Sequence, residues 1–229
     1  MNNMKAQVKS RERVVNHGEV FTSEREVNAM LDLVKDETER IDSRFLEPAC
    51  GDGNFLAEIL KRKLKIVKKQ YGNNLSDYEK FSILAIMNIY GVDILEDNVE
   101  DCRDRLYEIW EKDYKEISKN KTRASIKKAA RYVLSKNILW GDALTMRQSH
   151  GQPIIFAEWS FVMDNMVKRR DFRLDGLLVD EKPNIAITNQ TSMFDTDENW
   201  EFYEETQAKM PSPIKTYPLI DYRKVYEVE

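Results

Sequence analysis

The chain has 229 residues, of which 41% are hydrophobic and 33% charged, and its formal net charge is −4. At roughly 100 to 200 residues per domain, this length allows one domain with an extension or two small domains. The composition is typical of a soluble globular protein and excludes a collagenous or wholly disordered chain. No run approaches the roughly 18 apolar residues of a membrane span, and residues 1–20 lack the apolar core of a signal peptide. We therefore expect a cytoplasmic protein without a membrane partner.

Cysteine and histidine are scarce. Cys50 and Cys102 are the two cysteines, too few for a disulfide framework or a cysteine-rich zinc site. His17 and His150 have no further histidine or cysteine at ligand spacing, so no metal site is predicted. The sequence also lacks a Gly-x-Ser-x-Gly elbow and a phosphate-binding loop, which disfavours a hydrolase triad and ATP hydrolysis.

Charge is distributed unevenly along the chain. Residues 175–229 contain twelve acidic and five basic side chains, whereas basic residues cluster at 61–69, 119–131 and 168–173. Each basic cluster could contact phosphate, and each could equally be the solvated face of a helix. The cluster at 168–173 includes an aromatic residue, as a contact to a single nucleic-acid strand would.

Helical and strand patterns alternate along the first 160 residues. Ser23 and Glu26 have the spacing of a capping box before an apolar helical repeat, and Ser76 and Glu79 repeat this signal. Helices are predicted at 24–39, 55–64, 76–88, 99–110 and 122–135, and strands at 41–48, 89–94, 137–140 and 153–156. Strands separated by helices imply an α/β fold in which a largely parallel sheet has helices on both faces.

The patterns weaken beyond this point. Residues 177–179 and 185–188 are weak strand candidates, and residues 210–229 have the prolines and tyrosines of an extended arm. We therefore predict one domain at 1–160 and an acidic extension at 161–229 that packs on the domain or on a partner.

A turn with two glycines follows the first predicted strand, where residues 47–55 read Glu-Pro-Ala-Cys-Gly-Asp-Gly-Asn-Phe. Ligands of open parallel sheets bind at the carboxyl ends of the strands, and Gly51 and Gly53 lack side chains that would block their approach. Asp93 ends the next predicted strand, where a carboxylate can accept both hydrogen bonds of a ribose diol. Asp142 follows the third and can accept a hydrogen bond from an exocyclic amine such as that of adenine. Each residue could instead serve only as a turn or cap.

These motifs give the chain a resemblance to a known family. In order and spacing, segments 17–23, 45–55, 91–94 and 141–144 resemble those of the S-adenosylmethionine-dependent adenine-N6 DNA methyltransferases of bacterial restriction-modification systems. The resemblance covers about residues 17–160 and implies a Rossmann-like class I methyltransferase sheet, here incomplete at its C-terminal end. It also implies S-adenosyl-L-methionine as the cofactor.

The resemblance assigns roles to individual residues. The methionine end of the cofactor would contact Phe21 and Thr22, which precede a serine where the family usually has proline. The loop around the methionine moiety and sulfonium would consist of Glu47, Ala49, Gly51 and Gly53. The nucleoside end would be held by Asp93 at the ribose, by Ile94 packed on the adenine, and by Asp142 at the adenine amine.

The family's catalytic motif, Asn or Asp followed by Pro-Pro and an aromatic residue, is absent. Aligning 153–156 with the fourth strand of the family places Ala157, Glu158, Trp159 and Ser160 at the four motif positions. A rearranged site would use Glu158 as the hydrogen-bond acceptor and Trp159 as the surface on which a flipped base stacks. In the alternative interpretation, both are ordinary packing or surface residues, and no catalytic residue is assigned.

Three functions are consistent with these motifs. We expect an S-adenosylmethionine-binding, methyltransferase-like protein related to adenine-N6 DNA methylation in a restriction-modification system. Because about 70 residues follow the fourth predicted strand, DNA recognition would come from a partner subunit, in a homo- or hetero-oligomer. A second hypothesis is a catalytically inactive subunit that binds the cofactor and acts through a protein partner. The third is methylation of RNA or protein with Glu158 as an unconventional acceptor.

Overall fold

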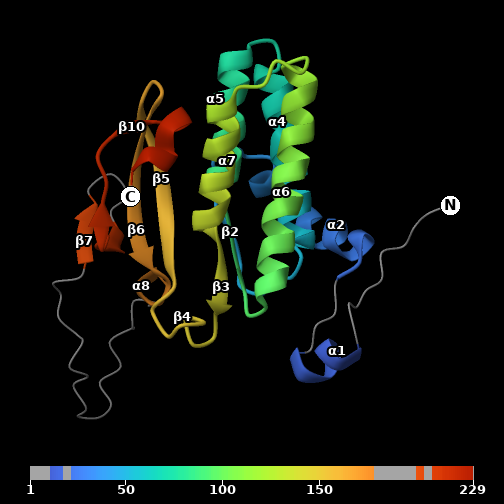
Figure 1. Cartoon of the computed structure of the whole chain (residues 1–229), viewed down its shortest axis with the longest axis vertical. Coiled ribbons are helices and arrows are strands. Elements are labelled where there is room, and N and C mark those ends of the chain that lie inside the picture. Colours follow the sequence, from blue (N-terminus) through green and yellow to red (C-terminus); the bar gives the residue numbers. More distant parts are fainter. Residues whose placement is uncertain (1–10, 18–21, 178–199, 204–207, 229) are drawn as a thin grey trace.

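A four-stranded mixed sheet forms the centre of the protein (Figure 1). The computed structural model describes residues 11–17, 22–177, 200–203 and 208–228. The sheet order is β1-β2-β3-β4, with β1 (Phe45–Glu47), β2 (Ile89–Asp93) and β3 (Ile138–Asp142) parallel and β4 (Arg147–Gln148) antiparallel to β3. The predicted strands at 41–48, 89–94 and 137–140 are therefore confirmed, with shifted ends.

A helix precedes each parallel strand, and helices also follow β1 and β2. The helices are α1 (Arg11–His17), α2 (Glu24–Asp32), α3 (Lys35–Thr38), α4 (Asn54–Tyr71), α5 (Leu75–Met87), α6 (Glu96–Ile117), α7 (Ala124–Asn137), α8 (Leu174–Leu177) and the 3-10 helix η2 (Tyr222–Glu227). The capping box of Ser23 and Glu26 is present at the start of α2. The second predicted box is wrong, because the N-cap of α5 is Asn74, two residues before Ser76. The predicted helix at 24–39 is divided into α2 and α3.

The helices and strands are arranged in layers. The strand β2 begins two residues after α5 ends, and β3 follows α7 directly, so these two helices continue the strands beyond their amino ends. The longer helices α4 and α6 pack together and contact β2, and a core that includes Trp110, Tyr78 and Tyr114 fills the space among the four helices. In Figure 1, α5 and α7 lie above β2 and β3, and α4 and α6 lie beside them.

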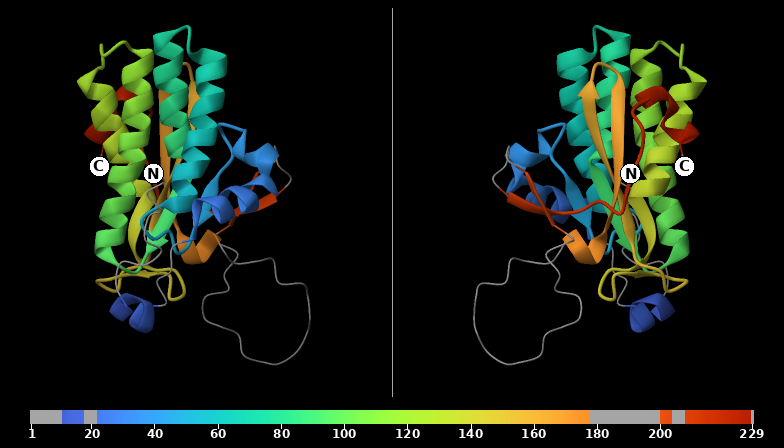
Figure 2. Two further views of the ribbon diagram at one scale, coloured as in Figure 1. Left: turned by 90° about the vertical axis from the view of Figure 1, so that its right-hand side faces the viewer. Right: turned by 90° about the vertical axis from the view of Figure 1, so that its left-hand side faces the viewer.

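A β-hairpin covers the other face of the sheet, which corrects the prediction of helices on both faces. It consists of β5 (Ile155–Met163) and β6 (Met166–Arg173), and β9 (Lys215–Thr216) and β10 (Ile220–Asp221) pair with β6. Tyr90 and Val92 of β2 pack against Ile154, Phe156 and Leu174 on this side. In Figure 2 the hairpin lies on the side of the sheet opposite the long helices.

The hairpin also corrects the predicted strand at 153–156, which is not a fourth parallel strand. Its residues lead into β5, which is antiparallel to β6 and outside the central sheet. The strand β5 continues across residue 160, and the C-terminal η2 packs on α7, where the Tyr132 hydroxyl donates to the Val228 carbonyl at 3.0 Å. A separate pair of strands is formed by β7 (Trp200–Tyr203) and β8 (Ala208–Pro211).

Candidate functional site

The loops that carry the predicted cofactor residues meet at one edge of the sheet. The register pairs Glu47 with Gly91 and Asp93 with Trp140, so the carboxyl ends of β1, β2 and β3 lie side by side. The first loop, residues 48–53, connects β1 to α4. The Cys50 amide donates to the Val92 carbonyl at 2.9 Å and fixes this loop against β2. Three segments far apart in the sequence thus converge where ligands of open parallel sheets bind.

The first loop requires its glycines. Gly51 and Gly53 have φ values of +52° and +86°, in the left-handed region that other residues rarely adopt. A Cβ atom at Gly53 would lie 2.7 Å from Sγ of Cys102, so α6 leaves no room for a side chain there. Gly53 is also the N-cap of α4, whose first turn carries no acidic side chain. The positive end of the α4 dipole therefore remains available to a ligand anion.

Two buried thiols meet where this loop packs on α6, one from the loop and one from the helix. Cys50 and Cys102 are both free and buried. A hydrogen bond with Cys102, together with burial, raises the pKa of the Cys50 thiol well above its usual range. The Cys50 thiol is therefore protonated, and both cysteine side chains are packed as small apolar groups.

Asp93 connects the first loop to the second loop, which follows β2 at Ile94 and Leu95. Its Oδ2 accepts a hydrogen bond from the Gly51 amide at 2.8 Å, and its Oδ1 accepts from the Leu95 amide at 2.9 Å and from Nδ2 of Asn98 at 3.2 Å. The side chain is 8% exposed. Because a carboxylate offers about four acceptor positions, a ribose diol would use the remaining one and displace one of these donors.

The predicted adenine residues lie on the neighbouring loops. Ile94 is 53% exposed, and Leu144 is 93% exposed next to half-buried Asp142. One Asp142 oxygen accepts from the Leu144 amide at 2.9 Å, which leaves the other without a backbone partner among the described residues. Nε1 of Trp140 donates to the Ile94 carbonyl at 3.0 Å and thereby positions this loop. Sequence reasoning gave Trp140 no role, although strand alternation places it on the same face as Asp142.

The remaining predicted residues flank the first loop. Glu47 is partly buried, and burial raises the pKa of its carboxyl group. Ala49 is exposed at the start of the turn, and the Thr22 carbonyl accepts a hydrogen bond from Nδ2 of Asn54 at 3.3 Å. Phe21 lies outside the described residues.

Arg105 is a residue of α6 that contacts the first loop and that sequence reasoning missed. From α6, its guanidinium donates to the Asp52 carbonyl at 3.0 Å and to Oδ1 of Asn54 at 2.8 Å, and it pairs with the Asp52 carboxylate at 3.0 Å. This arginine binds both sides of Gly53. Its position in a charged amphipathic helix gave no sign of this contact, which depends on how α6 packs beside α4.

The residues aligned with the catalytic motif lie elsewhere. Ala157, Glu158 and Trp159 are in the middle of β5 and are almost fully buried. Nε1 of Trp159 donates to Oδ1 of Asn137 at 3.0 Å, so the indole is fixed inside the fold and offers no surface to a flipped base. These contacts favour the interpretation of Glu158 and Trp159 as packing residues.

Glu158 is engaged by cations. Its carboxylate lies 2.6 Å from Arg44 and 2.9 Å from Arg170, and it accepts a hydrogen bond from the Ser160 hydroxyl at 2.8 Å. Burial opposes ionisation, but the hydrogen bonds from Arg170 and Ser160 lower the pKa of Glu158. A carboxylate stabilised in this way is a weak proton acceptor.

The basic cluster at 168–173 is a strand rather than a helix end. Arg169 forms two hydrogen bonds of 2.8 Å with Asp171, Arg170 pairs with Glu158, and Arg173 pairs with Asp175. These arginines therefore balance carboxylates within the hairpin and its neighbours, which weakens the case for a contact with a nucleic-acid strand.

Comparisons of the chain with protein-family models, with curated proteins and with solved structures return no match. Within the described part of the chain, no helix has the length and apolar character to cross a membrane. The same part contains no group of three or more histidine, cysteine, aspartate or glutamate side chains placed to hold a metal ion.

Proposed function

We propose that this protein binds S-adenosyl-L-methionine at the carboxyl edge of β1, β2 and β3 and is a methyltransferase-like protein related to adenine-N6 DNA methylation in a restriction-modification system. The observation that carries the proposal is the convergence of three short motifs at one sheet edge. These motifs are Glu47 to Gly53, Asp93 with Ile94, and Asp142. They are distant in the sequence but lie at the carboxyl ends of neighbouring strands. Their chemistry matches the successive parts of this cofactor.

The methionine end suits the first loop. The α4 N-terminus, free of acidic side chains in its first turn, favours the cofactor carboxylate. The partly buried Glu47 offers a carboxylate to the ammonium or sulfonium charge, and a nearby cation would in turn favour its ionised form. Gly51 is half-buried and has no side chain, which permits close approach to its backbone.

The nucleoside end of the cofactor suits the second and third loops, which follow β2 and β3. Asp93 supplies acceptors for ribose hydroxyls, and the exposed Ile94 and Leu144 supply apolar contacts for a flat ring. Asp142 has an oxygen available for the adenine amine. The α6 helix, by contrast, begins with Glu96 and Asp97, so its first turn would repel an anion.

A second function is favoured by the position of residues 157–160. Ala157, Glu158 and Trp159 are buried in β5, Glu158 is paired with two arginines, and the Ser160 hydroxyl donates to Glu158. The aligned positions therefore offer no suitable acceptor for the adenine amine. A catalytically inactive subunit that binds the cofactor and acts through a protein partner accounts for this arrangement. DNA would then be contacted through that partner.

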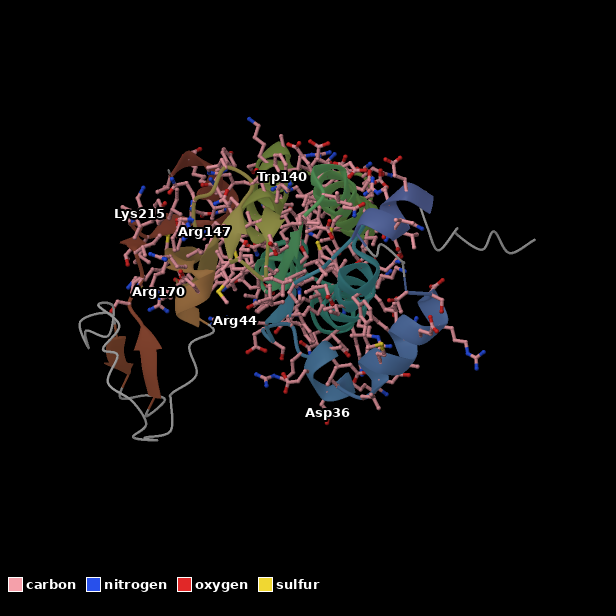
Figure 3. The ribbon with its side chains drawn as sticks, turned by 90° about the horizontal axis from the view of Figure 1, so that it is seen from below. Asp36, Arg44, Trp140, Arg147, Arg170 and Lys215 are labelled. Atoms are coloured by element: carbon pink, nitrogen blue, oxygen red, sulfur yellow. The ribbon has the colours of Figure 1, made fainter. Side chains whose placement is uncertain are left out.

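Calorimetric titration with S-adenosylmethionine and S-adenosylhomocysteine tests cofactor binding. Asp93→Ala is expected to weaken binding by about 1 to 3 kcal/mol, because it removes charge-assisted acceptors. The matched control is Asp36→Ala, an exposed aspartate on α3, far from the loops and labelled in Figure 3. No binding by the unaltered protein, or equal affinity in the Asp93 variant, contradicts the proposal.

Transfer of labelled methyl groups separates the two functions. The purified chain, loaded with cofactor, is incubated with adenine-containing duplex DNA, and the expected result is binding without transfer. Transfer by the isolated chain would support an active enzyme and rule out the inactive subunit.

A further inference from the structure

In the part of the chain that the structure describes, β1 is an open edge strand of the central sheet. Among the described strands, β1 pairs with β2 alone. The Phe45 amide donates to the Asn88 carbonyl at 3.1 Å, so Phe45 directs its backbone groups toward β2. In a parallel ladder, alternate residues bond to the same neighbour. The N–H and C=O of Leu46 therefore point away from β2.

A cavity of about 210 Å³ adjoins this edge. One wall is β1, Tyr90 of β2 forms the base, and one face of the hairpin forms the other wall. The hairpin register pairs Phe156 with Phe172 and Glu158 with Arg170, which places these four side chains on the face toward the cavity.

The cavity is apolar inside. The ring of Tyr90 meets that of Phe156 edge to face at 5.4 Å, and its hydroxyl is already bonded to the Ala157 carbonyl at 3.1 Å. Because a dry cavity of about 150 Å³ holds a benzene molecule, the space beside β1 suits one aromatic or large aliphatic side chain. Leu46, 41% exposed, leaves the edge accessible.

Two arginines lie at the rim of the cavity. Arg44 and Arg170 both pair with the carboxylate of Glu158. The side chain of Arg44 is 52% exposed, whereas that of Glu158 is 11% exposed. In Figure 3, Arg44 and Arg170 lie toward the same side of the molecule, away from Trp140. An acidic group arriving at this side would therefore meet Arg44 first.

We propose that the open edge of β1 and its adjoining cavity bind an extended, acidic segment of a partner polypeptide, which adds to the sheet as a strand. Its backbone bonds to the outward groups of Leu46, one apolar side chain fills the cavity, and a carboxylate pairs with Arg44. Natural sheets usually protect an edge with lysine, proline or a bulge, and Phe45 to Glu47 has none of these. Pro48 limits the pairing to this short stretch.

This interface is distinct from the cofactor edge. The cavity includes none of the residues from Glu47 to Gly53, and the strand would approach the side of β1 rather than its carboxyl end. Strand addition therefore goes beyond the proposed cofactor function and does not depend on it.

The probe is a fluorescein-labelled peptide, Thr-Glu-Thr-Phe-Thr-Glu-Thr, which carries Glu, Phe and Glu on one face when extended. Fluorescence anisotropy is expected to give saturable binding with a Kd on the order of 100 µM. The control is the same peptide N-methylated at Phe and at the following Thr. One of these two adjacent amides would face β1, so the control peptide cannot donate that hydrogen bond. It is expected to bind at least tenfold more weakly to the unaltered protein.

Two protein variants locate the site. Leu46→Pro removes the outward N–H and leaves the ladder to β2 intact, and Phe172→Trp fills the cavity. Each is expected to weaken peptide binding at least tenfold, whereas Leu33→Trp, at a position 86% exposed on the α2 C-cap, leaves it unchanged. Circular dichroism and the S-adenosylmethionine titration of each variant show whether the fold and the cofactor edge are retained.

The proposal is overturned by the absence of saturable peptide binding up to about 1 mM, or by equal binding to Leu46→Pro, Phe172→Trp and unaltered protein. Adenosine is tested in the same way. If the peptide does not bind but adenosine does, and Phe172→Trp abolishes adenosine binding, the cavity is a nucleoside site and the proposal is overturned. Loss of peptide binding with normal cofactor binding separates this interface from the proposed function.

Discussion

The Asp93 carboxylate and the Gly51 amide are joined by a hydrogen bond of 2.8 Å, although the two residues are 42 positions apart. This bond connects the turn after β1 with the end of β2. Since the carboxylate is buried and also accepts from Leu95, it stabilises both loops before any ligand is present. The residue expected to recognise ribose therefore also holds the site together.

Substitution of Asp93 should reduce stability as well as cofactor affinity. Asp93→Ala leaves the Gly51 and Leu95 amides without their acceptor, and the free energy of unfolding should fall by about 1 to 3 kcal/mol. Asp93→Asn keeps one acceptor oxygen and should lose less. Urea denaturation followed by circular dichroism measures both changes. If Asp93→Ala is as stable as the unaltered protein, the loops do not depend on this carboxylate.

Gly53→Ala should destabilise the first loop more than its backbone conformation alone explains. Gly151→Ala is a matched control, because Gly151 has φ +84° but a Cβ there meets nothing within 4 Å. A left-handed alanine costs about 1 to 2 kcal/mol, and Gly53→Ala should cost more because of its contact with Cys102. Adding Cys102→Ala should recover part of the difference. Equal costs at the two glycines would refute the close contact.

Lys63 should make stability depend on pH. This lysine is fully buried in α4, donates to the carbonyls of Ile41 (3.0 Å) and Ser43, and burial lowers its pKa to about 7. Between that value and the ordinary lysine pKa, the unfolded chain binds the extra proton. Stability should therefore rise with pH across this window by up to about 1.4 kcal/mol per pH unit.

The variant Lys63→Met tests this dependence. It should flatten the pH profile of the urea midpoint between about pH 7 and pH 10, even if losing the bonds to Ile41 and Ser43 lowers stability overall. Lys65→Met, an exposed lysine on the same helix, should keep the slope. An unchanged slope in Lys63→Met would show that other groups cause it.

Introducing the family's Asn-Pro-Pro-Tyr motif at Ala157 to Ser160 should disrupt the hairpin rather than restore catalysis. Trp159 lies opposite Arg169 and Glu158 opposite Arg170 in the ladder. Two prolines there remove ladder donors and the Trp159 contact with Asn137, at a cost of about 3 kcal/mol or more. Thermal unfolding and methyl transfer are measured together. A stable variant that methylates adenine would show that the hairpin contacts of Glu158 and Trp159 are not required for folding. It would also contradict the inactive-subunit function.

Local patterns predicted the helices and the three parallel strands well. The Ser23 capping box and the apolar spacing of α4, α6 and α7 are properties of single segments, which a sequence displays directly. The hairpin was missed because a short apolar run such as 153–156 does not reveal whether its neighbour will be parallel or antiparallel. Its turn contains Asp164 at φ +45° instead of the glycine that would have marked it.

The candidate site was predictable by position but not by contact. The strand ends placed Asp93 and Asp142 at one edge, since parallel strands share their direction. The bonds from Arg105 to Asp52 and from Trp140 to Ile94 depend on how separate elements pack, and no spacing in the sequence encodes them.

Cys50 and Cys102, the two cysteines of the chain, offer an intrinsic reporter for the first loop. Because both thiols are buried between that loop and α6, a thiol-specific reagent can reach them after the loop opens, and its labelling rate measures the opening equilibrium. A ligand that closes the loop should slow labelling in proportion to its occupancy. Mass spectrometry can therefore follow the motion of the site in the natural sequence, without an introduced probe.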